Sequence, residues 1–177
     1  MTTTPTTIAD TADSAPAAGS LARPTWDDVA TRIARRSFCL LATSSPAQRP
    51  HVAGVLYEEA DGALYVSIER NSRKGRNIAA NPHVAVTVPI RRLPVGPPAT
   101  AMFASTAELL ATDDPHVRAL VESGRIKGIT GHGELELPQG CIVRIAPPSV
   151  VHTYGIGLSL RALLREPLRG GGRVERP

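Results

Sequence analysis

A strand that runs directly into a short capped helix is the most constraining feature of this sequence. Residues 63–68 follow the apolar alternation of a β-strand. Ser72 then stands where its hydroxyl can accept a hydrogen bond from an amide of a first helical turn. Asn81 and Pro82 end that helix, because the residue before a proline is disfavoured in helical conformation. Three small or apolar residues at i, i+3, i+4 predict the face that packs against a sheet: Gly75, Ile78 and Ala79.

The first turn of this predicted helix is strongly cationic. Arg73, Lys74 and Arg76 crowd the helix N-terminus, where the helix dipole already places partial positive charge. From Arg70 through Arg91 and Arg92 the sequence contains no Asp or Glu. A bound anion would resolve this conflict, because free amides, the dipole and the cations would all converge on one phosphate. An ordinary solvated helix is the alternative, and we favour the phosphate site over it.

The remaining pattern predicts a mainly β (α+β) fold, a small antiparallel barrel with peripheral helices. The predicted strands are 38–43, 52–57, 63–68, 83–88, 100–112 (bent near Ser105–Thr106), 141–146 and 150–154. Three predicted helices begin at the caps Thr25, Ser72 and Asp114, and a short closing helix is predicted over residues 159–165. Residues 58–62 are predicted to be a hairpin connection and 89–98 a proline-rich loop. The absence of βαβ alternation excludes a Rossmann fold.

The chain divides into three parts by composition. Residues 1–23 are rich in Thr, Ala and Pro and are expected to be a disordered leader, 24–158 form the barrel domain, and 159–177 form a short helix and a basic Arg-rich tail. The leader lacks the basic start and apolar run of a signal peptide, and no segment has the ~20 apolar residues of a membrane span. We therefore expect a cytoplasmic protein without a membrane partner, in which Cys39 and Cys141 are buried free thiols.

The sequence carries no recognisable catalytic motif. It has no P-loop, GxGxxG or GxSxG sequence, and its five histidines lack metal-binding spacing, so we predict no metal site and assign no catalytic residue. Residues 124–133 form a glycine-rich segment that is either a mobile loop over a site or a simple crossing. The lack of a catalytic motif is expected when a bound organic cofactor supplies the chemistry and the protein supplies position and electrostatics.

Residues 72–82, Ser-Arg-Lys-Gly-Arg-Asn-Ile-Ala-Ala-Asn-Pro, closely resemble the phosphate-binding segment of pyridoxamine 5′-phosphate oxidase and of the wider class of FMN-binding split barrels. The turn at Gly62, the strand 63–68 and the later residues 105–109 fit this class in order, and the resemblance covers roughly residues 34–155. It implies a split β-barrel that binds its cofactor in a cleft between the subunits of a homodimer. It also implies hydride transfer to or from a small organic substrate.

The resemblance further implies a set of cofactor-binding residues. On the phosphate side these are His51, Ser72, Arg73, Lys74 and Arg76, with Arg73 and Lys74 matching the pair that holds the phosphate. On the ring and ribityl side these are Val52, Ala53, Gly54, Ser67 and Thr100. The oxidase's C-terminal Trp and Arg substrate motif has no counterpart in residues 142–147, so the resemblance does not extend to the oxidase's own substrate.

Several alternatives stay open on the sequence alone. One branch of the class uses the deazaflavin coenzyme F420 in place of FMN, and the motif does not separate the two cofactors. A carrier that binds the same cofactor, or a haem-like ligand, without turnover is a second hypothesis. A basic nucleic-acid-binding barrel is a third and less favoured one, because aromatic residues make up only 3% of the chain and most of the net charge of +4 lies after Leu160.

Overall fold

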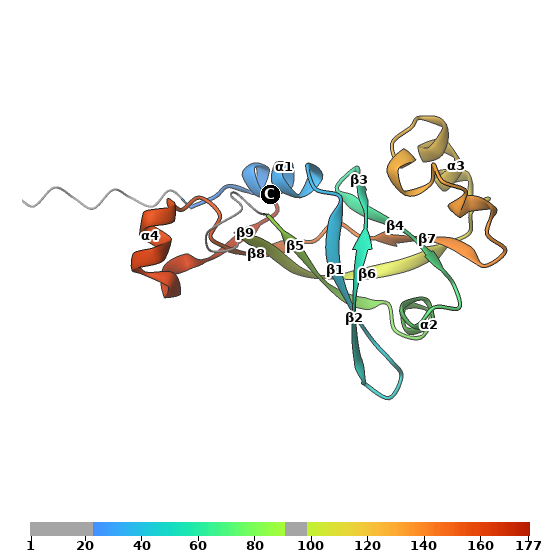
Figure 1. The fold of residues 1–177 in the computed structure, drawn as a ribbon, viewed down its shortest axis with the longest axis horizontal. Coiled ribbons are helices and arrows are strands. Elements are labelled where there is room, and N and C mark those ends of the chain that lie inside the picture. Colours follow the sequence, from blue (N-terminus) through green and yellow to red (C-terminus); the bar gives the residue numbers. More distant parts are fainter. Residues whose placement is uncertain (1–22, 91–98) are drawn as a thin grey trace, which may run out of the picture.

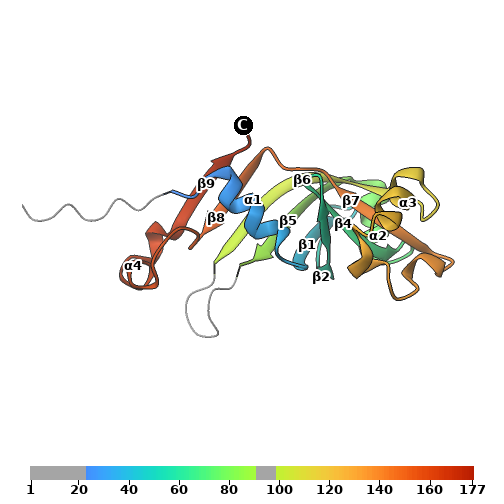
Figure 2. The same ribbon diagram turned by 90° about the horizontal axis from the view of Figure 1, so that it is seen from above.

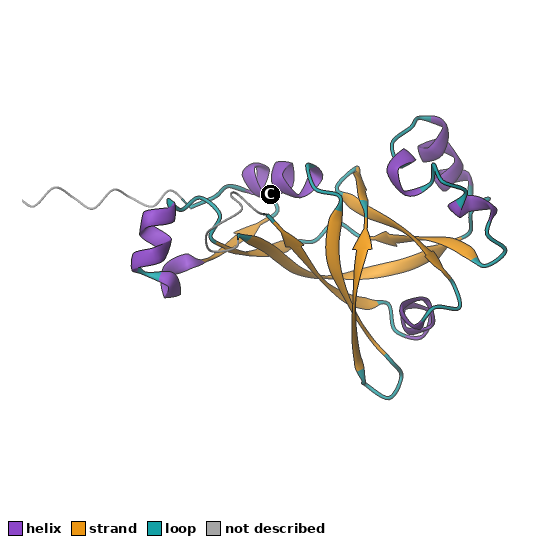
Figure 3. Cartoon of the chain, in the orientation of Figure 1, coloured by secondary structure: helices purple, strands orange, loops and turns teal. Residues whose placement is uncertain are grey.

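The computed structural model describes residues 23–90 and 99–177, and shows a mostly antiparallel sheet that curls into a half-barrel, with helices around it (Figures 1 and 3). The strands are β1 (Phe38–Ser44), β2 (Pro50–Leu56), β3 (Glu58–Ala60), β4 (Ala63–Glu69), β5 (His83–Pro89), β6 (Thr100–Leu110), β7 (Gly140–Ile145), β8 (Val150–Tyr154) and β9 (Gly171–Glu175). The α-helices are α1 (Trp26–Ala34), α2 (Arg73–Ala80), α3 (Pro115–Glu122) and α4 (Leu160–Arg165). The 3₁₀ segments are η1 (Lys127–Ile129), η2 (Glu134–Glu136) and η3 (Pro167–Gly170).

The main path of the sheet runs β2-β1-β5-β6-β7-β4-β3. The long strand β6 pairs with β5 from Thr100 to Thr106 and changes its other partner along its length. Its first residues pair with β8, which carries β9, whereas Ala107 to Leu110 pair with β7. The change of partner falls between Met102 and Ala107, a stretch that contains the bend predicted near Ser105. The Ser105 hydroxyl donates to the carbonyl of Ala146 at 2.7 Å.

This topology separates two ends of the molecule. The helix α2 packs against β1, β2 and β6, at the end of β6 where the amide of Ala107 donates to the carbonyl of Pro82. The elements β8, β9 and α4 lie at the opposite end in both views (Figures 1 and 2). A site beside α2 and a site beside β9 are therefore distinct within one chain.

Two apolar cores hold the fold together. The larger core lies between the sheet and α1 and includes Val29, Leu41 and Val86, with Trp26 packed partly against it. The smaller core joins β3, β4 and β7 to α3 and η1, and includes Tyr65 and Val117. Aliphatic residues dominate both cores, as the scarcity of aromatic residues requires.

The helix caps follow the predicted chemistry. Thr25 and Asp28 form a reciprocal capping box at α1, Ser72 caps α2, and Asp114 caps α3 with Pro115 in the first turn. Each cap supplies an acceptor for first-turn amides that have no partner within the helix.

The structure departs from the sequence analysis at three points. Residues 58–60, predicted to be only a connection, form the short strand β3 against β4. The tail contains a further strand, β9, where the sequence predicts none. On α2, Ala79 is exposed rather than packed, and Asn77 is buried beside Gly75 and Ile78 instead. The proposed disordered leader, apart from Arg23, and most of the proline-rich loop lie outside the described residues.

Candidate cofactor site

The N-terminus of α2 is tied closely to the strand that precedes it. The Ser72 hydroxyl accepts a hydrogen bond from the amide of Gly75 at 3.2 Å, and the amide of Ser72 donates to the carbonyl of Glu69 at 3.0 Å. A Cβ on Gly75 would lie 2.3 Å from the carbonyl oxygen of Arg70. Only glycine at this position lets the helix start so close to β4.

An open cavity of ≈600 Å³ lies between α2 and the turn that joins β1 to β2. From α2 it is lined by Arg73, Arg76 and Asn77, which share one face of the helix at i, i+3 and i+4. From the other side it is lined by Arg49 and His51, together with Ser45, Pro46 and Pro50. The cavity brings together three predicted site residues, His51, Arg73 and Arg76, from separate parts of the sequence.

The lining of this cavity is cationic and uncompensated. It contains three arginines and one histidine, and none of its residues is acidic. None of Arg49, Arg73 and Arg76 forms an ion pair with any residue among those the structure describes. Guanidinium groups bind phosphate oxygens through paired N–H donors. The cavity therefore has the charge and the donors that a phosphate requires.

A buried hydrogen bond fixes the helix against the sheet behind this cavity. The Nδ2 of Asn77 donates to Oγ1 of Thr43 on β1 at 3.0 Å, and both side chains are buried. The guanidinium of Arg76 also donates to the carbonyl of Asn71, just before the helix cap. These contacts hold the cationic face of α2 toward the β1–β2 turn.

The remaining residues of the predicted phosphate group lie at the same helix end. Ser72 uses its hydroxyl for capping, and Lys74 is half-buried on a different side of the helix from Arg73. Lys74 is not among the residues that line the cavity. Within one chain, the arginines are therefore better placed for a phosphate in this cavity than Lys74 is.

The residues expected beside the cofactor ring lie on β2 at the edge of the sheet. Val52 and Gly54 point to its exposed face, while Ala53 packs against the core. The strand β2 pairs only with β1 among the strands of the described residues. Its other edge therefore offers backbone N–H and C=O groups to a ligand.

Two further predicted residues lie farther from the cavity. Ser67 is half-buried on β4 opposite Ile142 of β7. Thr100 begins β6, opposite Tyr154, and lies about 20 Å along this strand from Thr106 at the α2 end, taking ~3.3 Å per residue. The structure of one chain does not bring Thr100 together with the phosphate group of residues.

Arg49 is the site residue that the sequence analysis misses. It lies in the turn before β2, and its amide donates to the Ser45 hydroxyl at 3.1 Å. Arg49 is far from α2 in the sequence, so the sequence does not show that its turn packs against this helix. Its only local signal is a cation two residues before the predicted residue His51.

An exposed apolar surface adjoins these residues on the outer face of β1 and β2. Phe38, Leu40, Val52 and Leu56 are 44%, 39%, 58% and 59% exposed, respectively. The strand register places them as neighbours, with Phe38 opposite Leu56 and Leu40 opposite Gly54. A contiguous surface of this kind on one sheet face is typical of a protein interface.

The two cysteines are structural rather than reactive. Both are free and buried, as predicted, and burial raises the pKa of Cys39 to about 12 and raises that of Cys141 as well. A thiol with a raised pKa is a poor nucleophile at neutral pH. Within residues 23–90 and 99–177, no three His, Cys, Asp or Glu side chains gather to hold a metal ion, and no helix there is long and apolar enough to span a membrane.

Comparison with known proteins agrees with this architecture. A sequence profile of the pyridoxamine 5′-phosphate oxidase family matches residues 25–150. The chain belongs to this family. The matched range includes the α2 cavity and ends at the start of β8, so β9 and the tail lie outside it. No protein with a curated description matches the sequence significantly.

Solved structures share the split-barrel fold at low sequence identity. A haem-binding protein from Mycobacterium smegmatis is 19% identical with a TM-score of 0.63; the match covers 75% of this chain and 55% of that protein. The haem storage protein HutZ from Vibrio cholerae is 18% identical with a TM-score of 0.59, over 69% of this chain and 89% of that protein. An FAD-binding protein from Mesorhizobium loti is 18% identical with a TM-score of 0.56, over 70% and 88%. This chain thus spans about half the length of the mycobacterial protein.

Proposed function

We propose that this protein binds a phosphate-bearing flavin or deazaflavin, FMN or F420, and acts with it as an oxidoreductase on a small organic molecule. The observation that carries the proposal is the cationic cavity at α2. Family membership supports the class of cofactor, and the cavity supports the position of its phosphate.

The residues of the cavity fit a phosphate group. Arg73 and Arg76 would contact it from the helix, Arg49 from the β1–β2 turn, and His51 from the start of β2. The first-turn amides of α2 add donors and a favourable dipole. The same cations, with Arg70 near them in sequence, would also receive the glutamate tail of F420, so the charge of the cavity suits both cofactors.

The ring of the cofactor would lie along β2. Val52, Ala53 and Gly54 would present backbone groups there, and Ser67 would lie toward the ribityl chain, as the family resemblance implies. A Cβ on Gly54 would lie 2.9 Å from the ring of Phe38. The absence of a side chain at residue 54 therefore lets the Phe38 ring pack directly on the backbone of β2.

A homodimer would complete the site. The apolar surface of Phe38, Leu40, Val52 and Leu56 adjoins the β2 edge and would be covered by a second copy of the chain. A partner subunit could then bring Thr100 to the cofactor, since Thr100 is far from α2 within one chain. The bound ring would supply the hydride chemistry, and the protein residues would bind, orient and exclude water. The absence of a disulfide between Cys39 and Cys141 fits a protein of the reducing cytoplasm.

A carrier without turnover is the second candidate. The names of two similar structures, a haem-binding and a haem storage protein, support it. The uncompensated arginines would pair with the carboxylates of haem in the same way as with a phosphate. The charge of the cavity therefore suits both functions, and only the identity of the bound ligand distinguishes an oxidoreductase from a haem carrier.

A comparative titration tests the proposal. The purified protein is titrated with FMN, F420 and haem, and absorbance and fluorescence changes are followed for each. We expect FMN or F420 to bind with a shifted band, and the reduced complex to be oxidised by a small organic acceptor. Tight haem binding with no flavin or deazaflavin binding would favour the carrier, and binding of a cofactor without any turnover would contradict the enzyme proposal.

A further inference from the structure

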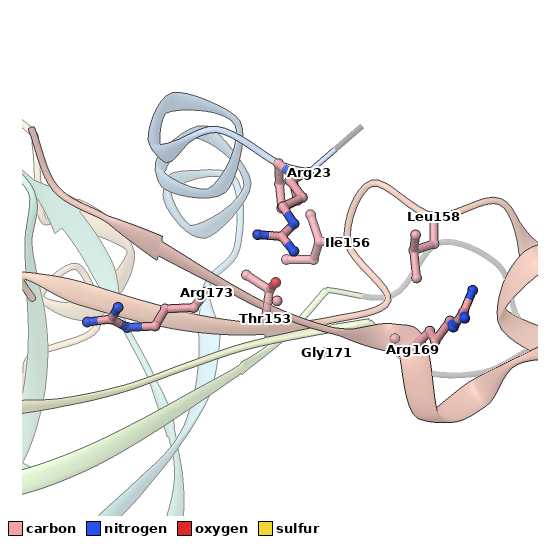
Figure 4. A pocket seen from close by; sticks show the side chains of 10 residues that line it. Arg23, Thr153, Ile156, Leu158, Arg169, Gly171 and Arg173 are labelled. Carbon is pink, nitrogen blue, oxygen red and sulfur yellow. The ribbon is translucent and has the colours of Figure 1, made fainter. Parts of the chain in front are cut away.

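A second cavity, of ≈800 Å³, lies at the opposite end of the molecule from α2 (Figure 4). It is formed by β8, β9, η3 and the residues just before α1. It shares no lining residue with the α2 cavity. Its size falls within the range of cavities that bind small organic ligands, about 300–1,000 Å³.

The floor of this cavity contains a buried polar group. Thr153 on β8 is only 2% exposed, and its hydroxyl oxygen lies on the side of the strand that faces Arg23 (Figure 4). Among the described residues this hydroxyl has no hydrogen-bond partner, and its oxygen is not fully buried, because Arg32 Nε is the one side-chain atom there that is both fully buried and unpartnered. A ligand with an acceptor in the cavity would supply the missing partner.

Glycine keeps this hydroxyl accessible. Gly172 on β9 lies directly opposite Thr153, and a Cβ at residue 172 would lie 2.6 Å from Thr153 Oγ1. A side chain there would occupy the space beside the hydroxyl. A Cβ on Gly171 would meet nothing within 4 Å, so the adjacent backbone is open as well.

The walls combine positive charge with apolar surface. Arg23, Arg169 and Arg173 line the cavity, and none of its lining residues is acidic. Arg169 pairs with Glu166 and Arg173 with Glu175, whereas Arg23 has no ion pair within the described part of the chain. In Figure 4 Arg23 extends toward Thr153 and Ile156, while the guanidinium of Arg173 points away along its strand.

We infer that this cavity binds a small organic anion with an apolar body. Its carboxylate would accept hydrogen bonds from Arg23 and from the Thr153 hydroxyl, and its apolar part would pack on Ile156, Leu158 and Pro24. Both features follow from the lining: the guanidinium and the hydroxyl can each donate to one acceptor, and the aliphatic wall offers apolar contact. This inference does not depend on the proposed cofactor.

Octanoate is the probe for a test by calorimetry, with octanol as its neutral counterpart and acetate as the anion without an apolar body. We expect octanoate to bind more tightly than either. Arg23→Gln should weaken octanoate binding about 10-fold and leave octanol binding unchanged, as loss of one charge-assisted contact to an exposed guanidinium implies. Thr153→Val, which keeps the side-chain shape, should weaken octanoate binding several-fold. Arg165→Gln, an exposed arginine of α4 outside the cavity lining, is the matched control and should have no effect.

Amide NMR shifts of the wild-type protein locate the bound probe independently of any variant. We expect octanoate to shift the signals of Thr153 and of residues 170–172. No binding of octanoate, equal binding by Arg23→Gln and Thr153→Val, or shifts confined to other parts of the chain would each overturn the inference. None of these measurements involves FMN or F420, so failure here leaves the cofactor proposal intact.

Discussion

Replacing Arg73 with glutamine tests the proposed phosphate site at a residue that lines the α2 cavity. Arg73 lines the cavity, sits in the first turn of α2 and has no ion pair among the described residues. A charge-assisted hydrogen bond contributes about 1.5–3 kcal/mol, which corresponds to roughly 10- to 150-fold in affinity. Because Arg73 is exposed and its cavity open, we expect the lower end, about 10-fold weaker binding of FMN or F420.

The thermal stability of the Arg73→Gln apoprotein provides an independent test. Without cofactor, Arg73→Gln should unfold at the same temperature as wild type or slightly higher, because a cation at the positive end of a helix is unfavourable when no anion is bound. The assay pairs a fluorescence titration of cofactor with thermal denaturation of the apoprotein.

Two comparisons make this result interpretable. Arg118→Gln, an exposed arginine of α3 outside the cavity lining, should leave affinity unchanged. The double variant Arg73→Gln/Arg76→Gln should lose less affinity than the sum of the single losses if both side chains hold one phosphate. Unchanged affinity in Arg73→Gln, or an equal loss in Arg118→Gln, would refute the reasoning.

Gly75→Ala should destabilise the protein by about 1–3 kcal/mol in chemical denaturation, because its Cβ would clash with the carbonyl of Arg70; unchanged stability would show that α2 does not start so close to β4. Leu56→Asp should convert a dimer to a monomer in sedimentation without loss of helix and strand content, and a dimer that persists would place the interface elsewhere. The hydrogen bond from Arg125 lowers the pKa of Asp61, so this pair stabilises the fold above the ordinary carboxyl pKa and loses that effect as pH falls through the lowered value. Asp61→Asn should therefore show a shallower loss of stability below about pH 4 than wild type, and identical pH profiles would mean that the pair contributes nothing.

The parts of the fold that the sequence predicts well are those with local signals. The caps Thr25, Ser72 and Asp114 each place a side-chain acceptor before a short helix, and the structure confirms all three. The alternation of β5 likewise marks a strand with one buried and one exposed face, whereas β4 is buried on both faces except at Glu69 and, in part, Ser67. These signals depend on neighbouring residues only.

The strands that the sequence analysis misses depend on their partners. The strand β3 is three residues long and begins with two glutamates, and it becomes a strand only because β4 supplies its hydrogen bonds. The strand β9 begins with two glycines, which have low β propensity, and it forms along the free edge of β8. Pairing in three dimensions overrides local preference in both cases.

The candidate site shows the same division. The cationic turn of α2 is visible in the sequence because Ser72, Arg73 and Arg76 are close together in the chain. The contribution of Arg49 is not, since it arises from the packing of the β1–β2 turn against the helix. The burial of Asn77 in place of Ala79 is also tertiary, because its hydrogen bond to Thr43 turns that face of the helix toward β1.

Removing the phosphate from the ligand tests whether the cationic cavity at α2 binds that phosphate. Wild-type protein is titrated with FMN and with riboflavin, which share the ring and ribityl chain and differ only in the phosphate. We expect FMN to bind at least about 10-fold more tightly than riboflavin, and added salt to reduce the difference because it screens the arginines. If F420 is the cofactor and FMN binds weakly, the F420 affinity should show the same salt dependence. Equal affinities for FMN and riboflavin, together with salt-independent binding of F420, would contradict this expectation.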